Sequence, residues 1–325
     1  MAGPIRWGIL GTGKICRAFA AALRDTPDAV LAAVGSRELA SASAFVAEFG
    51  GTAYGGYQAL ADAPDLDIVY IGTPHPLHAD NALMLLHGGK AVLCEKPFTL
   101  NRRQAETVLA TARDKRLFAM EAMWSRFLPA IDTMRRLIAT GEIGDVRLVA
   151  AHLGFTADFG PEHRVYNPAL GGGALLDLGI YPLSLAADLL GPIAAVHATG
   201  ELGPTGVDIQ TGFSLRHENG GVSVCSCSFS VQLLSELVVT GTRGRIRLGE
   251  PFHKAQALEI TVDGATRRIE APYLGNGYVH QAIEAGRCLR AGLLESPRMT
   301  HAQTLELMGV MDAIRGQIGV VYPGE

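Results

Sequence analysis

The stretch Ile5–Phe19, IRWGILGTGKICRAF, constrains the fold of this chain more than any other. An apolar run ends in a glycine turn, and an alanine-rich stretch follows that is predicted to be helical over Arg17–Leu23. In the strand–turn–helix units that bind dinucleotides, a glycine such as Gly11 allows the tight turn, and one such as Gly13 lets the backbone approach a pyrophosphate. The N–H groups that open the helix then face the anion. An ordinary glycine turn of an α/β domain has the same pattern. The cofactor residues predicted here are Gly11, Gly13, Lys14 and Ile15.

Composition limits the class of protein. The 325 residues suffice for about two domains, and 48% hydrophobic against 18% charged residues allows sizeable cores. The formal net charge of −4 argues against a nucleic-acid-binding groove. No apolar run reaches the roughly 18 residues of a membrane span, and the first strand begins too early to leave room for a signal peptide. The five cysteines are odd in number and scattered, so we expect reduced core thiols, no metal site and a cytoplasmic location.

The second predicted strand, Ala29–Val34, ends in Gly35-Ser36-Arg37. In dinucleotide folds an acidic residue at this point binds the ribose 2′-hydroxyl, whereas an arginine accommodates a 2′-phosphate. The planar guanidinium offers several donors in an arrangement that suits phosphate. Ser36 and Arg37 therefore predict NADP, with NAD as the second choice, unless Arg37 is only a solvated charge at the end of a strand.

Two further loops follow strands of the kind that is buried on both faces of a parallel sheet. The run Asp67–Gly72 leads into TPHPLH, Thr73–His78, and the run Ala91–Cys94 leads into Glu95-Lys96-Pro97. Ligands bind at the carboxyl ends of such strands, so both loops are expected to contact the cofactor. The two histidines of the first loop lack other ligands at metal-binding spacing, which favours a cofactor contact over a metal. The cofactor residues predicted here are Thr73, Pro74, His75, His78, Glu95, Lys96 and Pro97.

Strands and helices alternate up to about residue 122, which predicts an α/β Rossmann domain, a doubly wound parallel sheet, over residues 1–122. Beyond it, strand patterns joined by short turns such as Asn219-Gly220 predict a large, mainly antiparallel, open-faced sheet. A helix over Ala174–Leu190 interrupts these strands, and two helices close the chain. The expected second domain is an α+β unit over residues 123–325. Its expected strands are Val146–Phe155, Ala194–Gly200, Gln210–His217, Val222–Ser230, Glu236–Thr242, Arg245–Leu248 and Leu258–Val262.

Five segments in this order, GTGKI, TPHPLH, CEKPFTLN, MEAMWSRFLPA and GGGALLDLGIYPLS, resemble the glucose–fructose oxidoreductase/inositol dehydrogenase-like (Gfo/Idh/MocA) family over nearly the whole chain. They are most similar to the branch with dimeric dihydrodiol dehydrogenase and NADP-dependent xylose dehydrogenase. Two positions depart from the common pattern: Cys16 replaces a small residue of the glycine turn, and Tyr181 stands where many members have histidine. The resemblance implies an oxidoreductase that forms a homodimer or homotetramer through the sheet of its second domain. It also implies cofactor contacts from Trp124 and Arg126.

Oxidising an alcohol with a nicotinamide cofactor releases a hydride and a proton, and the protein must accept the proton. Lys96 directly follows a central strand and is fixed by the proline after it, and partial desolvation of its stem would lower the pKa of its amine. Asp177 and Tyr181 are four residues apart on a predicted helix and so share one face. A tyrosine has a pKa of about 10, which a nearby ammonium lowers. With the resemblance, this predicts that Tyr181 is the acid/base, that Lys96 lowers its pKa and binds the substrate oxygen, and that Asp177 orients the pair.

Aromatic residues are expected to line the substrate pocket. Trp124, Phe155 and Tyr278 suit the apolar face of a sugar ring or a cyclic diol, although ordinary core packing explains them equally well. With Lys96 and Tyr181 they form the predicted substrate site. The predicted activity is NADP-dependent hydride transfer of the aldose 1-dehydrogenase or dihydrodiol dehydrogenase type. The alternatives are an NAD-dependent glycosidase on the same scaffold and a non-catalytic NADP-binding regulator, which would be expected to lack the lysine and the acid/base residue.

Overall fold

A computed structural model describes residues 3–325, and the chain divides into two compact units. The first comprises the chain up to Trp124 together with Leu274–Leu305, and the second comprises Ser125–Tyr273 and Glu306–Glu325. The sequence predicts a continuous second domain from residue 123, so this return of the chain to the first unit was not expected. Backbone and side-chain bonds explain the return: Ala119 N–H donates to Leu294 O at 3.1 Å, and His301 Nε2 lies 3.0 Å from Ala119 O. The returning segment thus satisfies polar groups on the edge of the first sheet.

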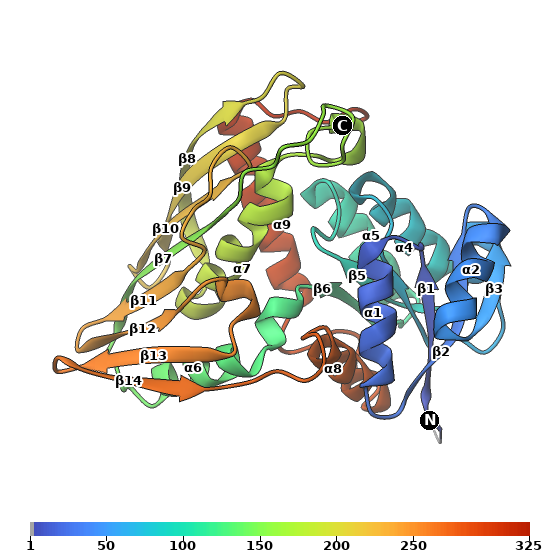
Figure 1. Ribbon diagram of the computed structural model, residues 1–325, viewed down its shortest axis with the longest axis horizontal. Coiled ribbons are helices and arrows are strands. Elements are labelled where there is room, and N and C mark those ends of the chain that lie inside the picture. Colours follow the sequence, from blue (N-terminus) through green and yellow to red (C-terminus); the bar gives the residue numbers. More distant parts are fainter. Residues whose placement is uncertain (1–2) are drawn as a thin grey trace. The chain divides into compact units, whose positions relative to one another are not determined.

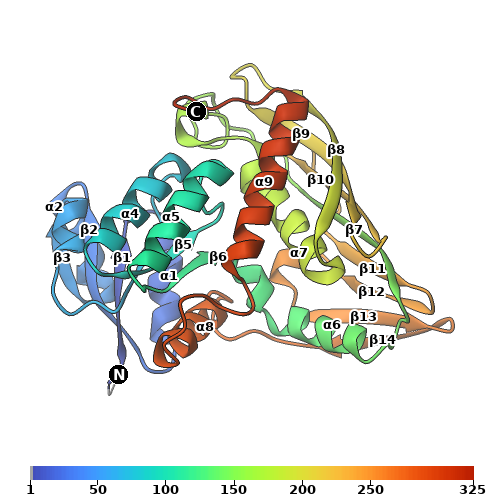
Figure 2. The same ribbon diagram turned by 180° about the vertical axis from the view of Figure 1, so that it is seen from behind.

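The first unit is a doubly wound α/β domain, as predicted. Its six strands are all parallel, in the order β3-β2-β1-β4-β5-β6. Helix α1 and the pair α4 and α5 cover opposite faces of this sheet (Figures 1 and 2). Strands β4 and β5 are buried along their whole length because helices cover both faces. The strands are β1 (Ile5–Leu10), β2 (Ala29–Ser36), β3 (Thr52–Gly55), β4 (Ile68–Ile71), β5 (Ala91–Glu95) and β6 (Ala119–Ala122); the helices are α1 (Lys14–Arg24), α2 (Leu39–Phe49), α3 (Tyr57–Ala61), α4 (His78–His87), α5 (Arg102–Asp114) and α8 (Val279–Arg290).

The second unit is built on the predicted mainly antiparallel sheet. Its order is β14-β13-β12-β11-β7-β10-β9-β8, and only the pair β7 and β10 is parallel. The last strand, Ala265–Glu270, was not among those expected, because its largely exposed residues show no alternation of apolar and polar side chains. The strands are β7 (Val146–Gly154), β8 (Ile193–Leu202), β9 (Asp208–His217), β10 (Val222–Ser228), β11 (Leu237–Gly241), β12 (Gly244–Leu248), β13 (Ala257–Val262) and β14 (Ala265–Glu270); the helices are α6 (Pro129–Ala139), α7 (Ile180–Leu190) and α9 (His301–Ile318), of which α9 begins in the first unit.

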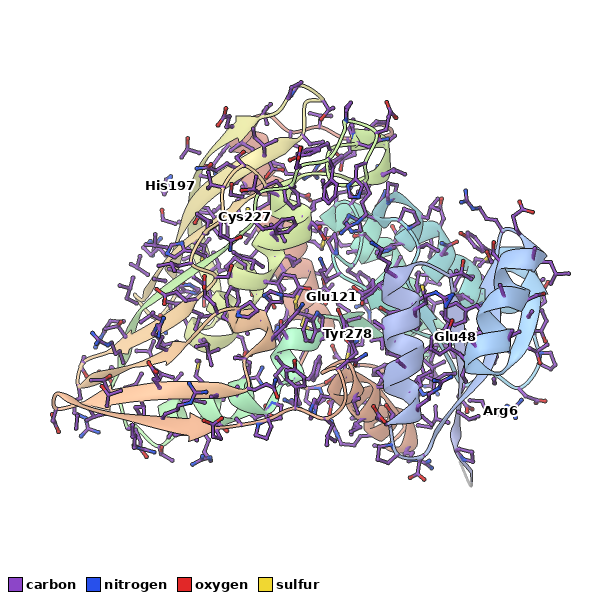
Figure 3. The ribbon with its side chains drawn as sticks, in the orientation of Figure 1. Arg6, Glu48, Glu121, His197, Cys227 and Tyr278 are labelled. Atoms are coloured by element: carbon purple, nitrogen blue, oxygen red, sulfur yellow. The ribbon has the colours of Figure 1, made fainter. Side chains whose placement is uncertain are left out.

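The two faces of the second sheet differ in burial. Inward residues such as Cys227 are fully buried, whereas His197 projects from the outer face (Figure 3). The outer face also carries apolar side chains: Leu148 is 37%, Val222 41% and Val224 44% exposed. All five cysteines lie within the described residues and are buried, unpaired thiols, which confirms the expectation of core thiols.

The predicted helix Ala174–Leu190 is not a regular α-helix. Its first turn, Leu175–Gly179, is π-helical, and α7 begins only at Ile180. A Cβ on Gly179 would lie 3.0 Å from Cys227 Sγ, so glycine lets this turn approach strand β10 closely.

Among residues 3–325, the segment Pro168–Leu190 is long and apolar enough to cross a membrane by length and composition alone. Since 89% of it is buried within the protein, it has the character of a core helix.

Candidate active site

The glycine turn of the first unit has the geometry that phosphate binding requires. Gly11 adopts φ +111°, and a Cβ there would lie 3.1 Å from Gly72 O. Helix α1 begins at Lys14, three residues earlier than predicted, with Gly13 as its N-cap. A Cβ on Gly13 would meet no atom of residues 3–325 within 4 Å, so this side of the turn is open to a ligand. The first N–H groups of the helix, which have no intrahelical acceptor, begin directly at this opening.

Cys16, the departure from the usual glycine pattern, is a packing residue. Its Sγ is buried and lies 3.4 Å from Gly72 O, where a side chain on Gly72 would collide with it. Burial raises the pKa of the Cys16 thiol to about 12, so the thiol stays protonated and inert. The thiol therefore fills the junction between β1 and β4, the position at which the strand order of the sheet reverses.

The other predicted cofactor residues of this unit follow strands at the same edge of the sheet. Ser36 ends β2 and is buried, and Arg37 after it is exposed. The Thr73–His78 loop follows β4, Lys96 follows β5 and Trp124 follows β6. Because the strands are parallel, these carboxyl ends form one edge, which is the ligand-binding edge of doubly wound sheets.

His78 ties two of these loops together. It is fully buried, with Nε2 2.8 Å from Thr73 O and Nδ1 2.9 Å from Pro97 O. Burial lowers the pKa of His78, while the two carbonyl groups act in the opposite direction. Asn81 adds to the same loop by donating from Nδ2 to Thr73 Oγ1 at 2.9 Å. His78 therefore holds the loops in place, whereas the half-buried His75 lies nearer the surface.

The backbone around Lys96 is fixed by two buried carboxylates. Glu95 is 5% exposed and accepts hydrogen bonds from the Tyr70 hydroxyl and, at 3.2 Å, from Lys96 N–H. Burial, followed by the charge of Glu95, raises the pKa of Tyr70, so Tyr70 remains a donor. Glu121 accepts from Phe98 N–H at 3.1 Å. The Lys96 side chain, which is half-buried, thus extends from a rigid support.

Two of the three predicted aromatic wall residues stack in the first unit. The rings of Trp124 and Tyr278 have centroids 4.5 Å apart and an interplanar angle of 30°. Asn276 anchors this loop: its Nδ2 donates to Ala18 O at 2.7 Å, and its Oδ1 accepts from Tyr278 N–H at 3.2 Å. Figure 3 labels Tyr278 at the start of α8. Trp124 is 2% exposed and Tyr278 is half-buried, so the pair is packed within the unit, and its role as a wall of the substrate pocket stays a prediction.

Asp177 and Tyr181 lie in the second unit, at the π-helical turn and the start of α7. They are 8% and 7% exposed. Asp177 Oδ2 lies 3.1 Å from Nη2 of Arg164, and the ring of Tyr181 lies 5.1 Å from that of His253. Arg164 and His253 were not predicted, since neither stands in a recognisable motif.

Asp208 is a further residue of this region that was not predicted from the sequence. It is fully buried, and its Oδ2 accepts hydrogen bonds from Leu175 N–H at 2.8 Å and from the Thr211 hydroxyl at 2.7 Å. Burial raises the pKa of Asp208 despite these bonds. Asp208 therefore holds the first turn of the helix that carries Asp177. A lone aspartate at the start of a strand gives no sequence signal for this.

Phe155 and Arg126, also predicted site residues, belong to the second unit. Phe155 is 37% exposed and packs edge-on against Phe229, with centroids 5.4 Å apart. Arg126 is 1% exposed, and its Nη2 lies 2.5 Å from Oδ1 of Asp188. The buried guanidinium of Arg126 thus has a carboxylate partner within its own unit. Its predicted contact with the cofactor stays a prediction.

Comparisons with known proteins agree with this architecture. Residues 5–122 match the oxidoreductase family with an NAD-binding Rossmann fold, and residues 131–247 match the GFO/IDH/MocA C-terminal domain. The chain is 37% identical over 331 residues to trans-1,2-dihydrobenzene-1,2-diol dehydrogenase of Danio rerio, covering 98% of each chain. It is 34% identical over 332 residues to the human protein of the same name, again covering 98% of each.

Solved structures of oxidoreductases are also similar to this chain. The aldose-aldose oxidoreductase of Caulobacter crescentus, complexed with glycerol, superimposes with a TM-score of 0.89 at 27% identity, covering 97% of each chain. The 3-ketoreductase KijD10 of Actinomadura kijaniata, in complex with NADP and TDP-benzene, superimposes with a TM-score of 0.86 at 28% identity, covering 97% of this chain and 98% of that one. The chain is therefore an oxidoreductase that acts on CH–OH groups, and it belongs to the Gfo/Idh/MocA family.

Proposed function

We propose that this protein is an NADP-dependent dehydrogenase or reductase that transfers a hydride between nicotinamide and a sugar or a vicinal diol. The observation that carries the proposal is the position of Lys96, held by Glu95 at the carboxyl end of β5 on the sheet edge that also bears the glycine turn. The full-length similarity to dihydrodiol dehydrogenases and the structural similarity to an aldose oxidoreductase support the two substrate classes.

The residues at this edge fit a dinucleotide. The open side of Gly13 and the first turn of α1 would bind the pyrophosphate. Ser36 and the exposed Arg37 would bind the ribose phosphate of NADP, for which a planar cation is better suited than for an uncharged ribose. The loops that His78 joins would bind the nicotinamide half.

When bound, the nicotinamide supplies the hydride acceptor or donor. The chain must then move one proton and orient the substrate. Tyr181 accepts the hydroxyl proton of the alcohol, and in the reverse direction it donates that proton to the carbonyl oxygen. Lys96 lowers the pKa of the phenol and donates a hydrogen bond to the substrate oxygen. Asp177, which is paired with Arg164, orients these two groups. Trp124, Phe155 and Tyr278 contact the ring of the substrate.

We also propose that the protein is a homodimer or homotetramer in the cytoplasm. Val222 and Leu148 are paired across β10 and β7, and with Val224 they place exposed apolar side chains on the outer face of the second sheet. A second copy of the same face would bury them. The five reduced, buried thiols fit a reducing compartment.

The test of this function is a substrate screen that follows the absorbance of reduced nicotinamide with NADP and with NAD. Aldoses, anhydro-sugars, dicarbonyls and cyclic diols are the classes to compare. We expect turnover with at least one class and a preference for NADP. Lys96→Met should abolish most of this turnover, and Lys115→Met, which changes an exposed lysine after α5, should not. A glycosidase would instead cleave a glycoside without net change in absorbance, and a regulator would bind NADP without turning over any substrate.

A further inference from the structure

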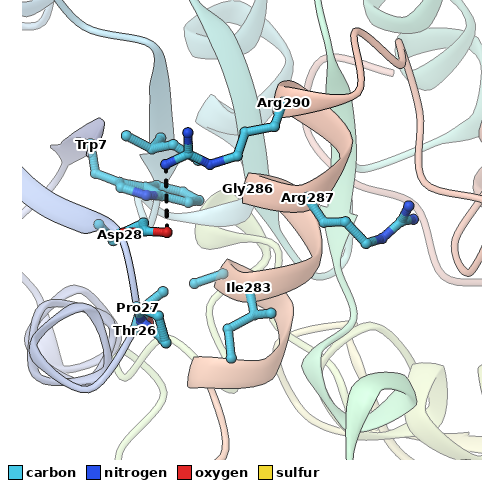
Figure 4. A pocket seen from close by; sticks show the side chains of 11 residues that line it. Trp7, Thr26, Pro27, Asp28, Ile283, Gly286, Arg287 and Arg290 are labelled. Atoms are coloured by element: carbon cyan, nitrogen blue, oxygen red, sulfur yellow. Dashed lines mark ion pairs between the residues drawn. The ribbon is translucent and has the colours of Figure 1, made fainter. Parts of the chain in front are cut away.

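A cavity of about 260 Å³ lies in the first unit, away from the loops described above (Figure 4). Its walls come from three parts of the sequence: the start of β1 with Ile5 and Trp7, the segment Thr26–Ala29 that leads into β2, and the face of α8 that carries Ile283 and Gly286. These residues stand at the amino ends of β1 and β2, whereas the glycine turn follows the carboxyl end of β1. A strand rises about 3.3 Å per residue, so the six residues of β1 separate the two ends by roughly 15–20 Å.

Hydrogen bonds between distant segments fix the frame of this cavity. Ile5 N–H donates to Asp28 O at 2.7 Å, which joins the starts of the two strands. Arg290 of α8 contacts the segments that precede both strands: its Nη2 donates to Gly3 O at 3.0 Å and lies 3.8 Å from Asp28 Oδ2 (Figure 4). The cavity is therefore part of the folded unit and needs no rearrangement of the backbone to exist.

The charges around the cavity compensate one another. Arg290 faces Asp28, and Arg287 points away from the cavity and donates to Glu284 at 2.8 and 2.9 Å (Figure 4). Thr26, the remaining polar residue of the wall, donates its hydroxyl to Ala22 O at 2.8 Å. Most of the wall is thus apolar and without net charge, which disfavours an ionic ligand and favours an apolar one.

One polar group of the wall is left over. Trp7 is fully buried, and within residues 3–325 its indole Nε1 has no hydrogen-bond acceptor. A buried indole N–H usually has a partner, because losing its hydration without one costs about 1–3 kcal/mol. The ring makes an edge contact with Phe19, with centroids 5.2 Å apart and an interplanar angle of 61°. Because Trp7 Nε1 is itself buried, an acceptor in the cavity reaches it only when side chains of the wall move aside.

We propose that this cavity is a second ligand site, which binds an uncharged molecule with a ring-sized apolar body and one hydrogen-bond acceptor. The acceptor pairs with Trp7 Nε1, and the apolar body fills the space between Ile5 and Ile283. The volume suits a substituted six-membered ring, since a cavity of about 150 Å³ already holds benzene. The site is independent of the proposed dehydrogenase function, and its test does not use turnover.

The test uses the two tryptophans of the chain, Trp7 and Trp124, whose indole N–H groups give two separate signals in a ¹H–¹⁵N NMR spectrum. Trp7→Phe assigns them. The probe is methyl benzoate, and cumene, which has a similar shape but no acceptor, is its control. We expect methyl benzoate to move the Trp7 indole proton downfield and to leave Trp124 unmoved, with NADP present at saturation. Cumene should bind more weakly and produce no downfield shift.

Two variants make the test specific. Trp7→Phe removes the donor, so it should abolish the preference of the site for methyl benzoate over cumene, a loss of about fivefold in the ratio of the two affinities, the effect of one hydrogen bond. Ile283→Phe, at a side chain that is 37% exposed, should fill the cavity and abolish binding of both probes while the rest of the spectrum stays native. The proposal is overturned if the Trp7 signal does not move up to the solubility limit of the probe, or if Ile283→Phe binds both probes as the parent chain does.

Discussion

Arg164 Nη2 lies 3.1 Å from Oδ2 of Asp177, so a largely exposed arginine is paired with a carboxylate that is almost buried. Such pairs contribute about 1 kcal/mol or less, because water screens the exposed partner. Arg164→Gln should therefore reduce kcat/KM about three- to fivefold through the orientation of Asp177, and Arg164→Lys should restore part of the loss. The midpoint of urea unfolding should hardly change. Steady-state kinetics of the two variants check this, and equal kcat/KM in all three proteins would show that the ion pair has no part in catalysis.

Asp208 predicts a pH dependence of stability. Its pKa is raised in the folded protein by burial, above an unfolded value of about 4. The folded state then binds the proton more tightly, so this group contributes stability that is complete below about pH 4 and is lost as the pH rises through its folded pKa. Asp208→Asn keeps an acceptor for Leu175 N–H and removes the ionisation.

Urea unfolding of both proteins between pH 4 and 7 measures this contribution. The free energy of unfolding of the parent chain should fall relative to that of Asp208→Asn as the pH rises. Asp208→Ala should be less stable than Asp208→Asn by about 1–3 kcal/mol, because Leu175 N–H and the Thr211 hydroxyl lose their acceptor. A constant difference between the parent chain and Asp208→Asn over this range would contradict the assignment of a raised pKa.

The sequence predicts the first unit well, because its signals are local. The glycine turn, the buried run that ends at Gly72 and the lysine after β5 each stand in a short segment whose pattern defines a strand, a turn or a helix. The carboxyl edge of the sheet follows from parallel pairing alone. Alternation of apolar and polar residues likewise predicts most strands of the second sheet.

What could not be predicted depends on contacts between distant residues. The return of Leu274–Leu305 to the first unit rests on bonds such as that from Ala119 N–H to Leu294 O, which no local pattern encodes. The π-helical turn depends on Gly179 packing against Cys227. Asp208 has its role only because folding brings it to Leu175, 33 residues before it in the chain.

Arg37 is predicted to decide the choice between NADP and NAD. A charge-assisted hydrogen bond to phosphate contributes about 1.5–3 kcal/mol, so Arg37→Gln should weaken NADP binding about 10- to 100-fold and leave NAD binding within about twofold. Isothermal titration of both nucleotides measures this without a substrate. Arg103→Gln, which changes an exposed arginine of α5, is the matched control and should bind both nucleotides normally. Unchanged NADP affinity in Arg37→Gln would make this arginine a solvated charge only.

A charged residue at position 224 is expected to disrupt the proposed self-association. Its side chain is 44% exposed on the outer face of the second sheet. Val224→Glu would place a charge in an interface made by two such faces, and it should shift the protein to a smaller mass in light scattering. Glu218→Gln, at an exposed position next to β9, is the control and should leave the mass unchanged. A parent chain that is already a monomer at micromolar concentration would refute the proposal.

The central claim, that the Tyr181 hydroxyl moves the proton, is tested most directly by the turnover number of Tyr181→Phe at saturating NADP and substrate. The substitution removes one oxygen from a side chain that is 7% exposed and keeps its ring in place against His253. We expect kcat to fall at least about 100-fold while the dissociation constant of NADP stays unchanged, and Tyr273→Phe, a half-buried tyrosine of the same unit, to turn over normally. A Tyr181→Phe enzyme with near-normal kcat would contradict the account.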